Sequence, residues 1–301
     1  MSSTTSEWID SQGFRKAVSE LIRLAACELP ADVEQALAAA RGRERAGSTA
    51  ELTLALFLQN IALAKEKQAA ICQDTGLPIF FIRHPEGLSQ RQLIRICREE
   101  VVEATKKQYL RHNAVDPVTG KNSGTNLGEG FPAFYFTEGD EPAIEMALLL
   151  KGGGSENVSA QYSLPYSDLS AERDLEGVRR VCLDAVRKAE GKGCAPGILG
   201  ICIGGDRGGG YAEAKHQLLR RLDDVNPDPA LAELEVRLLA EANQLGIGPL
   251  GLGGNTTLLG VKVGKLHCVP ASFFVTISYM CWVNRRRSVR IAPDGAWHVT
   301  G

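Results

Sequence analysis

The sequence lacks an excess of charge of either sign and a long apolar run. Its 34 Lys and Arg residues are balanced by 36 Asp and Glu residues, which gives a formal net charge of −2. This balance argues against nucleic acid or an anionic membrane surface as the main partner. No apolar run reaches the roughly 18 residues that indicate a transmembrane helix. The N-terminus has no basic segment followed by an apolar one, so we expect no signal peptide and a cytoplasmic protein.

Paired cysteines, internal repeats and low-complexity linkers are absent as well. Closed structural zinc sites use four ligands, often as C-x2–4-C pairs, and none of the 8 cysteines belongs to such a pair. A long cytosolic chain is also a poor setting for a disulfide framework. Because no shift in composition divides the 301 residues, we expect a single domain over residues 1–301.

Hydrophobic periodicity predicts a helical layer in residues 1–70 and a mixture of helices and strands in residues 71–301. Helices are expected over 14–29, from Asp32 to about 41, from Thr49, and over 89–110, 169–190, 211–222 and 229–245. Strands are expected over 77–82, 133–137, 143–150, 198–203, 257–263, 271–279 and 287–292. The alternation does not follow strict βαβ spacing. The predicted fold class is therefore α/β or mixed α+β, with the helical layer packed on a mixed-sheet part.

Four cysteines lie inside apolar segments. Cys27, Cys97 and Cys182 lie in helical patterns, and Cys202 lies in a predicted strand. A cysteine thiol in such a place behaves as a small buried hydrophobe. We therefore expect these four to pack in the core.

Three other cysteines lie where elements end. Cys72 opens a Cys-Gln-Asp-Thr-Gly turn, Cys194 lies in a Gly-rich loop before a strand, and Cys281 follows a strand. Three converging thiolates suit an iron–sulfur cluster with one open iron. Distant ligands leave no local signature, however, so spacing alone argues against a shared metal site, and Cys268 stays a fourth candidate.

Several motifs around these cysteines run in a recurring order. They are Ile-Cys-Gln-Asp-Thr-Gly at 71–76, Leu-Arg-His-Asn-Ala-Val at 110–115, Lys-Asn-Ser-Gly at 121–124, Lys-Gly-Gly-Gly-Ser-Glu-Asn at 151–157, the Gly-rich run 245–254 and Ser-Tyr-Met-Cys-Trp at 278–282. These stretches resemble the class I, iron–sulfur-dependent fumarase and tartrate dehydratase family. The resemblance is strongest to the α subunit of its two-subunit members and covers most of the chain from about residue 50.

The resemblance implies a [4Fe–4S] cluster held by Cys72, Cys194 and Cys281. Its open iron would bind substrate and act as a Lewis acid. The implied reaction is reversible hydration of a C4 dicarboxylate, fumarate to malate, with tartrate or 2-methylfumarate as alternative substrates. A cluster-free scaffold or regulatory binding protein on the same fold is the alternative from another functional class.

The same resemblance points to four substrate-binding positions. Arg111 would hold a substrate carboxylate through its two-pronged guanidinium, although an exposed arginine at a helix end is the structural alternative. Gln73 and Asp74 would bind substrate or orient water, with Asp74 as a possible base, or would only stabilise a turn. Gly154 would offer a backbone N–H to a carboxylate, or would belong to a tight turn.

Two departures from the family pattern affect the remaining predictions. Many members have a histidine at the position of Val269, whereas this chain has His267 two residues earlier, which we treat as the candidate catalytic histidine. Single-chain members also continue into a further C-terminal domain, whereas this chain ends at Gly301. We therefore expect a separate β subunit and an oligomeric assembly.

Other motifs receive no catalytic role. The G-x-G-x-x-G match at 246–251 follows a predicted helix, not the strand that dinucleotide binding requires. We expect the Gly-rich segment 204–210 to be a flexible connector and the three arginines at 285–287 to form a solvated or interface edge. Lys151 is expected to face solvent.

Overall fold

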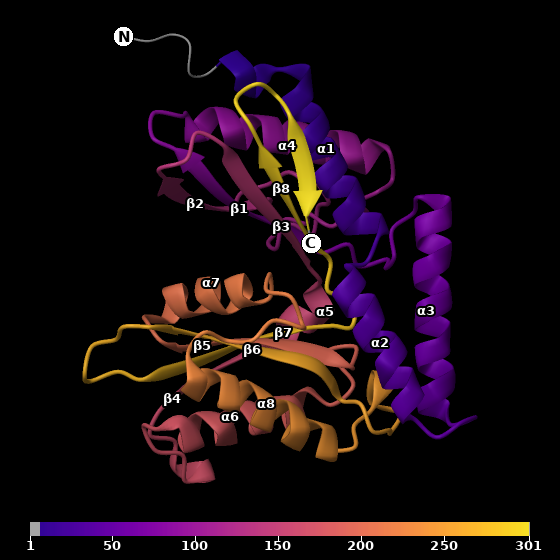
Figure 1. The fold of residues 1–301 in the computed structure, drawn as a ribbon, viewed down its shortest axis with the longest axis vertical. Coiled ribbons are helices and arrows are strands. Elements are labelled where there is room, and N and C mark those ends of the chain that lie inside the picture. The colour runs from indigo at the N-terminus through magenta and orange to yellow at the C-terminus, as the bar shows by residue number, and fades with distance from the viewer. Residues whose placement is uncertain (1–6, 301) are drawn as a thin grey trace. The chain divides into compact units, whose positions relative to one another are not determined.

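The computed structural model describes residues 7–300 and divides the chain into two compact units (Figure 1). Unit 1 comprises the residues up to Pro30, Asn60–Lys151, and the residues from Arg285 onward; unit 2 comprises Ala31–Gln59 and Gly152–Asn284. Each unit contains a mixed sheet with its own helices, so the predicted mixed α/β class is confirmed. Compactness of the units does not test whether they fold together, and the single domain over 1–301 stays a prediction.

Unit 1 is built on a five-stranded sheet in the order β2-β1-β3-β8-β9. The strands are β1 Leu77–Pro85, β2 Ala133–Gly139, β3 Ile144–Lys151, β8 Arg286–Ile291 and β9 Trp297–Thr300. Only β1 and β2 pair in parallel. Helices α1 (Gln12–Cys27) and α4 (Gln90–Lys106) pack against each other and share one core with the sheet. The short 3-10 helix η1 (Glu7–Asp10) precedes α1.

Side-chain caps and apolar spacing explain the two helices of unit 1. Ser11 accepts the N–H of Phe14 at the start of α1, and Ser89 accepts the N–H of Gln92 at the start of α4. Each cap satisfies an N–H that the first helical turn leaves without a partner. The predicted helices over 14–29 and 89–110 are confirmed, and each ends a few residues earlier than expected.

Unit 2 is built on a four-stranded sheet in the order β4-β7-β5-β6, with helices on both faces (Figure 1). The strands are β4 Ala160–Ser163, β5 Gly197–Gly204, β6 Leu258–Leu266 and β7 Phe274–Met280. The helices are α2 Ala31–Arg43, α5 Gly153–Asn157, α6 Leu175–Ala189, α7 Arg207–Gln217 and α8 Pro229–Gln244, with 3-10 turns η2 Ser167–Leu169 and η3 Pro249–Gly251. Helix α7 covers one face, and α6 and α8 cover the other. Helix α3 (Thr49–Lys67) has residues in both units.

Strand β5 carries a glycine where helix α7 packs closely against it. Leu199, Ile201 and Ile203 belong to the core that β5 shares with α6 and α8. On the opposite face, a Cβ placed on Gly200 would stand 2.0 Å from the carbonyl oxygen of Ala214 in α7. Glycine at this position therefore allows the backbone of α7 to approach the sheet.

We expect Gly200→Ala to lower the free energy of unfolding by about 3 kcal/mol, the upper end of the range for overpacked sites. The contact is with the helix backbone, which a side-chain rotation cannot relieve. Gly208→Ala is the control, since its Cβ would meet only a side-chain oxygen of Asp206 at 3.5 Å. That substitution should stabilise α7 by about 0.5 kcal/mol because alanine loses less entropy in a helix. Urea unfolding measures both, and equal effects would contradict the packing argument.

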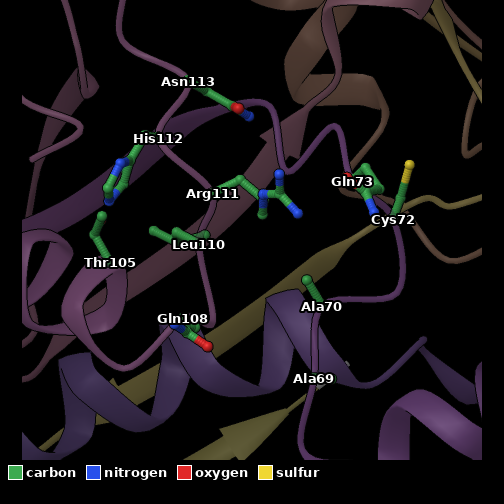
Figure 2. A pocket seen from close by; sticks show the side chains of 10 residues that line it. All are labelled: Ala69, Ala70, Cys72, Gln73, Thr105, Gln108, Leu110, Arg111, His112 and Asn113. Carbon is green, nitrogen blue, oxygen red and sulfur yellow. The ribbon is translucent and has the colours of Figure 1, made fainter. Parts of the chain in front are cut away.

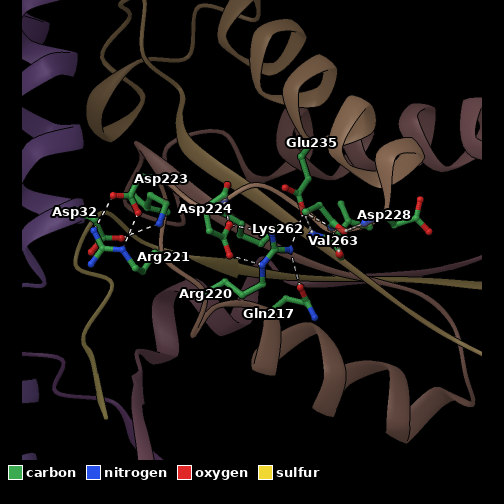
Figure 3. A network of polar contacts seen from close by, with 12 residues as sticks. Asp32, Gln217, Arg220, Arg221, Asp223, Asp224, Asp228, Glu235, Lys262 and Val263 are labelled. Carbon is green, nitrogen blue, oxygen red and sulfur yellow. Dashed lines mark hydrogen bonds and ion pairs between the residues drawn. The ribbon is translucent and has the colours of Figure 1, made fainter. Parts of the chain in front are cut away.

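In unit 2, a network of charged residues connects α8 with β6 and with the segment that follows α7 (Figure 3). Glu235 accepts Arg220 Nη1 at 2.8 Å and the N–H of Val263 at 2.7 Å. The ammonium of buried Lys262 donates to the carbonyl of Asp224 at 3.0 Å and also contacts its carboxylate. Burial alone would raise the pKa of Asp224, but hydrogen bonds from Arg220 and Lys262 outweigh it and hold the pKa below its usual range. Because these charges satisfy one another, we interpret the network as structural.

Some sequence predictions were wrong in position or environment. Helix α6 begins at Leu175, because Asp174 accepts the N–H of Gly177 and caps it there. The segment 204–210 is not a flexible connector, since its second half is the first turn of α7. The predictions also missed strands β4 and β9, which are only 4 residues each.

The basic residues expected at the surface are buried. Arg285, Arg286 and Arg287 are at most 8% exposed, and Lys151 is 2% exposed. Arg287 donates to the carbonyl groups of Glu28 and Leu29, which follow α1. It thus satisfies carbonyl groups just beyond a helix C-terminus, where cations are favourable. Within residues 7–300, no helix combines the length and the apolar character that crossing a membrane requires.

Candidate functional site

Cys194 and Cys281 lie at the same end of the sheet in unit 2. Cys194 comes shortly before β5 and Cys281 comes directly after β7. These strands are antiparallel, and Ile198 near the start of β5 pairs with Met280 at the end of β7. The N–H of Trp282 donates to the carbonyl oxygen of Cys194 at 3.2 Å. Strand pairing thus brings together two cysteines that are far apart in the sequence.

The backbone around Cys194 is held in an uncommon conformation. Its φ angle is +55°, in the left-handed region that few residues other than glycine adopt. The N–H of Cys194 donates to the carbonyl of Gly191 at 3.0 Å, and the N–H of Leu250 donates to the carbonyl of Ala195 at 2.8 Å. The Gly-rich run 245–254 therefore supports the cysteine loop. This run follows helix α8 and not a strand, so its G-x-G-x-x-G match does not have the context of a dinucleotide-binding site.

The environment of the two cysteines suits an inorganic cluster. Tyr279, two residues before Cys281, is 1% exposed, and its hydroxyl has no hydrogen-bond partner among residues 7–300. Burial and the neighbouring thiols of Cys281 and Cys194 raise the pKa of this tyrosine. A buried donor without a partner calls for an explanation such as an ion or ligand. The two thiols and this donor fit an iron–sulfur group, whose sulfur atoms accept hydrogen bonds.

Cys72 belongs to unit 1, in the loop between α3 and β1. Both backbone polar groups of Ile71 hold this loop in place. Its N–H donates to the carbonyl of Ala26 at 3.1 Å, and its carbonyl accepts the Asn60 amide at 2.8 Å. Within either unit, the described residues contain no group of three His, Cys, Asp or Glu side chains suited to a metal ion. A cluster shared by Cys72 with the two cysteines of unit 2 stays a prediction.

A polar pocket of about 510 Å³ opens beside Cys72 in unit 1 (Figure 2). Its lining comprises Ala69, Ala70, Cys72, Gln73, Thr105, Gln108, Leu110, Arg111, His112 and Asn113. Arg111 is the one lining residue with a formal charge when His112 is neutral, and no carboxylate of the described chain pairs with it. Figure 2 shows the Arg111 guanidinium extending toward Gln73, while the His112 ring points the other way. The pocket is therefore suited to an anion.

Buried polar side chains hold the segment that carries Arg111. Thr75 Oγ1 accepts the N–H of Arg111 at 3.1 Å and lies 3.0 Å from the Asn113 amide. With the amide oxygen of Asn113 turned toward Thr75, it accepts the Thr75 hydroxyl and the N–H groups of Thr75 and Gly76. Asn126, at φ +56°, accepts the N–H of Asn113 at 2.7 Å and donates to the Arg111 carbonyl at 2.6 Å. The sequence predictions missed Thr75, Asn113 and Asn126 as positioning residues. Thr75 lies in the motif at 71–76 and Asn113 in the motif at 110–115.

The structural alternative for Gly154, a tight turn at 152–154, is wrong, because Gly154 lies in the short helix α5. The residues after α5 lie close to the Cys194 loop. A Cβ on Gly193 would come 2.8 Å from Val158 Cγ2, and the hydroxyl of Ser159 accepts the N–H of Tyr279 at 3.1 Å. Helix α5 therefore lies at the same end of the sheet as the two cysteines. A substrate contact by Gly154 stays a prediction.

His267 and Cys268 lie at the opposite end of that sheet. Both are exposed and follow β6, whose last residue, Leu266, pairs with Gly204 at the far end of β5. The cysteine pair lies near Ile198, at the near end of the same strand. Because β5 is 8 residues long, the structure does not bring His267 or Cys268 to Cys194 and Cys281. A catalytic role for His267 stays a prediction.

The four cysteines predicted to pack in the core are all buried. Burial raises the pKa of the Cys27 thiol to about 11 and that of Cys202 to about 12, and it raises the pKa of Cys97 and Cys182 further. Such thiols seldom form the thiolate that a metal requires. The core prediction is confirmed, and these four are poor candidates for ligands.

Comparison with known proteins identifies the family. Residues 15–290 match the profile of the family described as fumarate hydratase (Fumerase). The chain belongs to this family. The family resemblance that the motifs predicted is thereby confirmed.

Relatives of this fumarate hydratase family member differ in length. A Geobacillus stearothermophilus protein provisionally named fumarate hydratase class I is 47% identical over 283 residues, which are 93% of this chain and 55% of that protein. A Methanocaldococcus jannaschii protein provisionally named L(+)-tartrate dehydratase subunit alpha is 38% identical over 282 residues, 92% of this chain and 97% of that protein. The L(+)-tartrate dehydratase subunit alpha of Escherichia coli K12 is 28% identical over 281 residues, 92% and 90% of the two chains. The chain thus spans about half of the first relative and most of both alpha subunits.

Within this family member, we expect Thr75→Val to loosen the Arg111 segment. Valine at the buried position of Thr75 leaves the N–H of Arg111 without its side-chain acceptor, which costs about 1–3 kcal/mol. Urea unfolding should show a loss of about 2 kcal/mol, and hydrogen exchange should show faster exchange of the Arg111 amide. Thr53→Val is the control, because the Thr53 hydroxyl only contacts the Thr49 carbonyl in its own helix. Protection of the Arg111 amide equal to wild type would show that Thr75 does not hold this segment.

Proposed function

We propose that this chain is the α subunit of an iron–sulfur hydro-lyase that catalyses the reversible hydration of a C4 dicarboxylate, fumarate to malate. The observation that carries the proposal is the meeting of Cys194 and Cys281 at one end of a sheet, beside a buried hydroxyl donor without a partner. Family membership supports Cys72 as the third ligand of a [4Fe–4S] cluster. When the cluster is bound, its open iron supplies a Lewis acid for the hydroxyl group or water.

The residues of the pocket in unit 1 supply the recognition of substrate. Arg111 donates two parallel N–H groups to one carboxylate of the diacid, which fixes both its position and its orientation. The Gln73 amide, exposed at the pocket wall, donates to a carboxylate oxygen or orients water. The pocket volume of about 510 Å³ lies within the range of small-molecule sites.

Asp74 is the proposed base in this chain. It lies in the same turn as Cys72 and Gln73 and precedes Thr75, which is bonded to the Arg111 segment. The Asp74 carboxylate is thus linked through Thr75 to the arginine that binds substrate. As the base, Asp74 receives the proton from the substrate carbon next to a substrate carboxylate. We assign His267 no step, because it lies at the far end of the unit 2 sheet.

The proposed enzyme works with a separate β subunit. Support comes from the two relatives named as alpha subunits, whose lengths this chain covers to 97% and 90%. Fumarate is proposed ahead of tartrate because the relative named fumarate hydratase class I is 47% identical, against 38% for the first of the alpha subunits.

Anaerobic purification tests the proposal. We expect about four iron and four sulfide per chain, with broad visible absorption. We expect hydration of fumarate only after addition of a β subunit, such as the product of a neighbouring reading frame. Colourless protein after reconstitution with iron and sulfide would favour the cluster-free scaffold instead. A loaded complex that turns over tartrate but not fumarate would reject the substrate and keep the reaction class.

A further inference from the structure

Tyr279 has a buried hydroxyl that stands out among the tyrosines of unit 2. Its side chain is 1% exposed, and the hydroxyl has no hydrogen-bond partner among residues 7–300. Tyr162, which is also buried, instead donates its hydroxyl to Asp184 at 2.8 Å. A tyrosine in an apolar core is usually bonded in this second way. The unsatisfied donor of Tyr279 therefore indicates a group that binds beside it.

The loop that carries Cys194 is built around the Tyr279 ring. A Cβ on Gly197 would stand 2.3 Å from the Tyr279 hydroxyl oxygen, and a Cβ on Gly193 would stand 2.5 Å from the ring edge. The two glycines on either side of Cys194 thus leave room for this ring. The N–H of Tyr279 is fixed by the Ser159 hydroxyl at 3.1 Å. Phenylalanine would fill the same space without the oxygen.

Two cysteines belong to the surroundings of the Tyr279 side chain. The Tyr279 ring lies against the loop that carries Cys194, and Tyr279 lies on β7, two residues before Cys281. Iron-bound cysteine sulfur and inorganic sulfide both accept hydrogen bonds. Such a bond stabilises the reduced, more negative form of a cluster and raises its reduction potential.

We propose that the Tyr279 hydroxyl donates a hydrogen bond to a sulfur atom of the iron–sulfur cluster and thereby raises its reduction potential and retains it in the protein. The inference rests on the proposed function, because it requires the cluster. It makes Tyr279 a positioning residue, since it acts through the cluster and not on the substrate.

Tyr279→Phe tests the proposal with opposite effects on the two forms of the protein. In the cluster-free protein, the midpoint of thermal unfolding should stay equal or rise, because an unsatisfied buried hydroxyl is removed. In the cluster-loaded protein, a redox titration followed by EPR should give a more negative reduction potential. Loss of visible absorption in the presence of an iron chelator should be about tenfold faster, at the low end of the effects of outer-shell partners.

Tyr162→Phe is the matched control. It removes a hydroxyl that Asp184 accepts, so the cluster-free protein should become less stable. The reduction potential and the rate of cluster loss should equal those of wild type, because Tyr162 pairs with Asp184 and not with the two cysteines.

Two results would overturn the inference. One is a loaded Tyr279→Phe protein with the potential and the cluster lifetime of wild type. The other is a fall in cluster-free stability as large as that of Tyr162→Phe, which would mean that the hydroxyl already has a partner. A wild-type protein that takes up no iron or sulfide would instead reject the proposed function itself, before the variant is examined.

Discussion

Replacing Cys194 with serine is expected to abolish cluster binding and activity while the fold survives. Iron per chain should fall from about four to below about one, because a serine hydroxyl is a poor substitute for a thiolate ligand. The position is exposed, so the free energy of unfolding should change by no more than about 0.5 kcal/mol. Iron and sulfide analysis, visible absorption and urea unfolding of the same preparation measure these effects. Cys281→Ser should behave in the same way.

Cys268→Ser is the control for this experiment. Cys268 is exposed like Cys194, but it lies at the other end of the unit 2 sheet. Its replacement should leave iron content, sulfide content and stability equal to wild type. Full iron content in Cys194→Ser, or loss of iron in Cys268→Ser, would contradict the assignment of the ligands.

Local signals predicted most of the elements. Polar caps such as Ser11 and Ser89 precede apolar residues at helical spacing, and both helices form where this pattern indicates. The same periodicity correctly predicted that Cys97 and Cys182 are buried. These predictions succeeded because helix caps and the periodic spacing of apolar residues are both visible within a few neighbouring residues.

Features that local patterns do not reveal depend on distant partners. Arg287 resembles a surface residue in sequence, and it is buried because carbonyl groups some 260 positions earlier accept its guanidinium. The catalytic role of His267 stays a prediction, but its place also depends on strand order, since it follows β6 at the end of the sheet opposite to Cys194 and Cys281. Strand order is a non-local property, and neither result follows from composition or spacing.

The candidate site likewise combines residues that were selected from the sequence with contacts that only the structure shows. Sequence context and the family resemblance selected Cys72, Cys194 and Cys281 and suggested Arg111, but they carried no information on how these side chains are held. Cys194 and Cys281 meet through antiparallel pairing of β5 and β7. Arg111 is held by Thr75, a residue 36 positions away. Strand pairing and long-range hydrogen bonds therefore determine where these residues lie, and neither follows from the motifs.

Arg111→Lys is expected to raise the KM for fumarate by roughly 10- to 100-fold with a smaller change in kcat. Lysine keeps the charge but offers a single ammonium group, so one of two charge-assisted hydrogen bonds, worth about 1.5–3 kcal/mol, is lost. Arg111→Gln should have a larger effect, because it also removes the charge. The exposed side chain has no ion pair with the described chain, so stability should stay within about 0.5 kcal/mol of wild type.

The comparison of lysine and glutamine decides how Arg111 acts. If only the electrostatic field of the pocket matters, Arg111→Lys should equal wild type, and both should weaken similarly in high salt. If the two-pronged geometry matters, Arg111→Lys should lie between wild type and Arg111→Gln. Arg91→Lys, an exposed arginine on α4 outside the pocket, should change neither constant. Calorimetric binding of succinate, a saturated C4 dicarboxylate, should follow the same order without turnover, and equal affinities in wild type and Arg111→Gln would remove Arg111 from the substrate site.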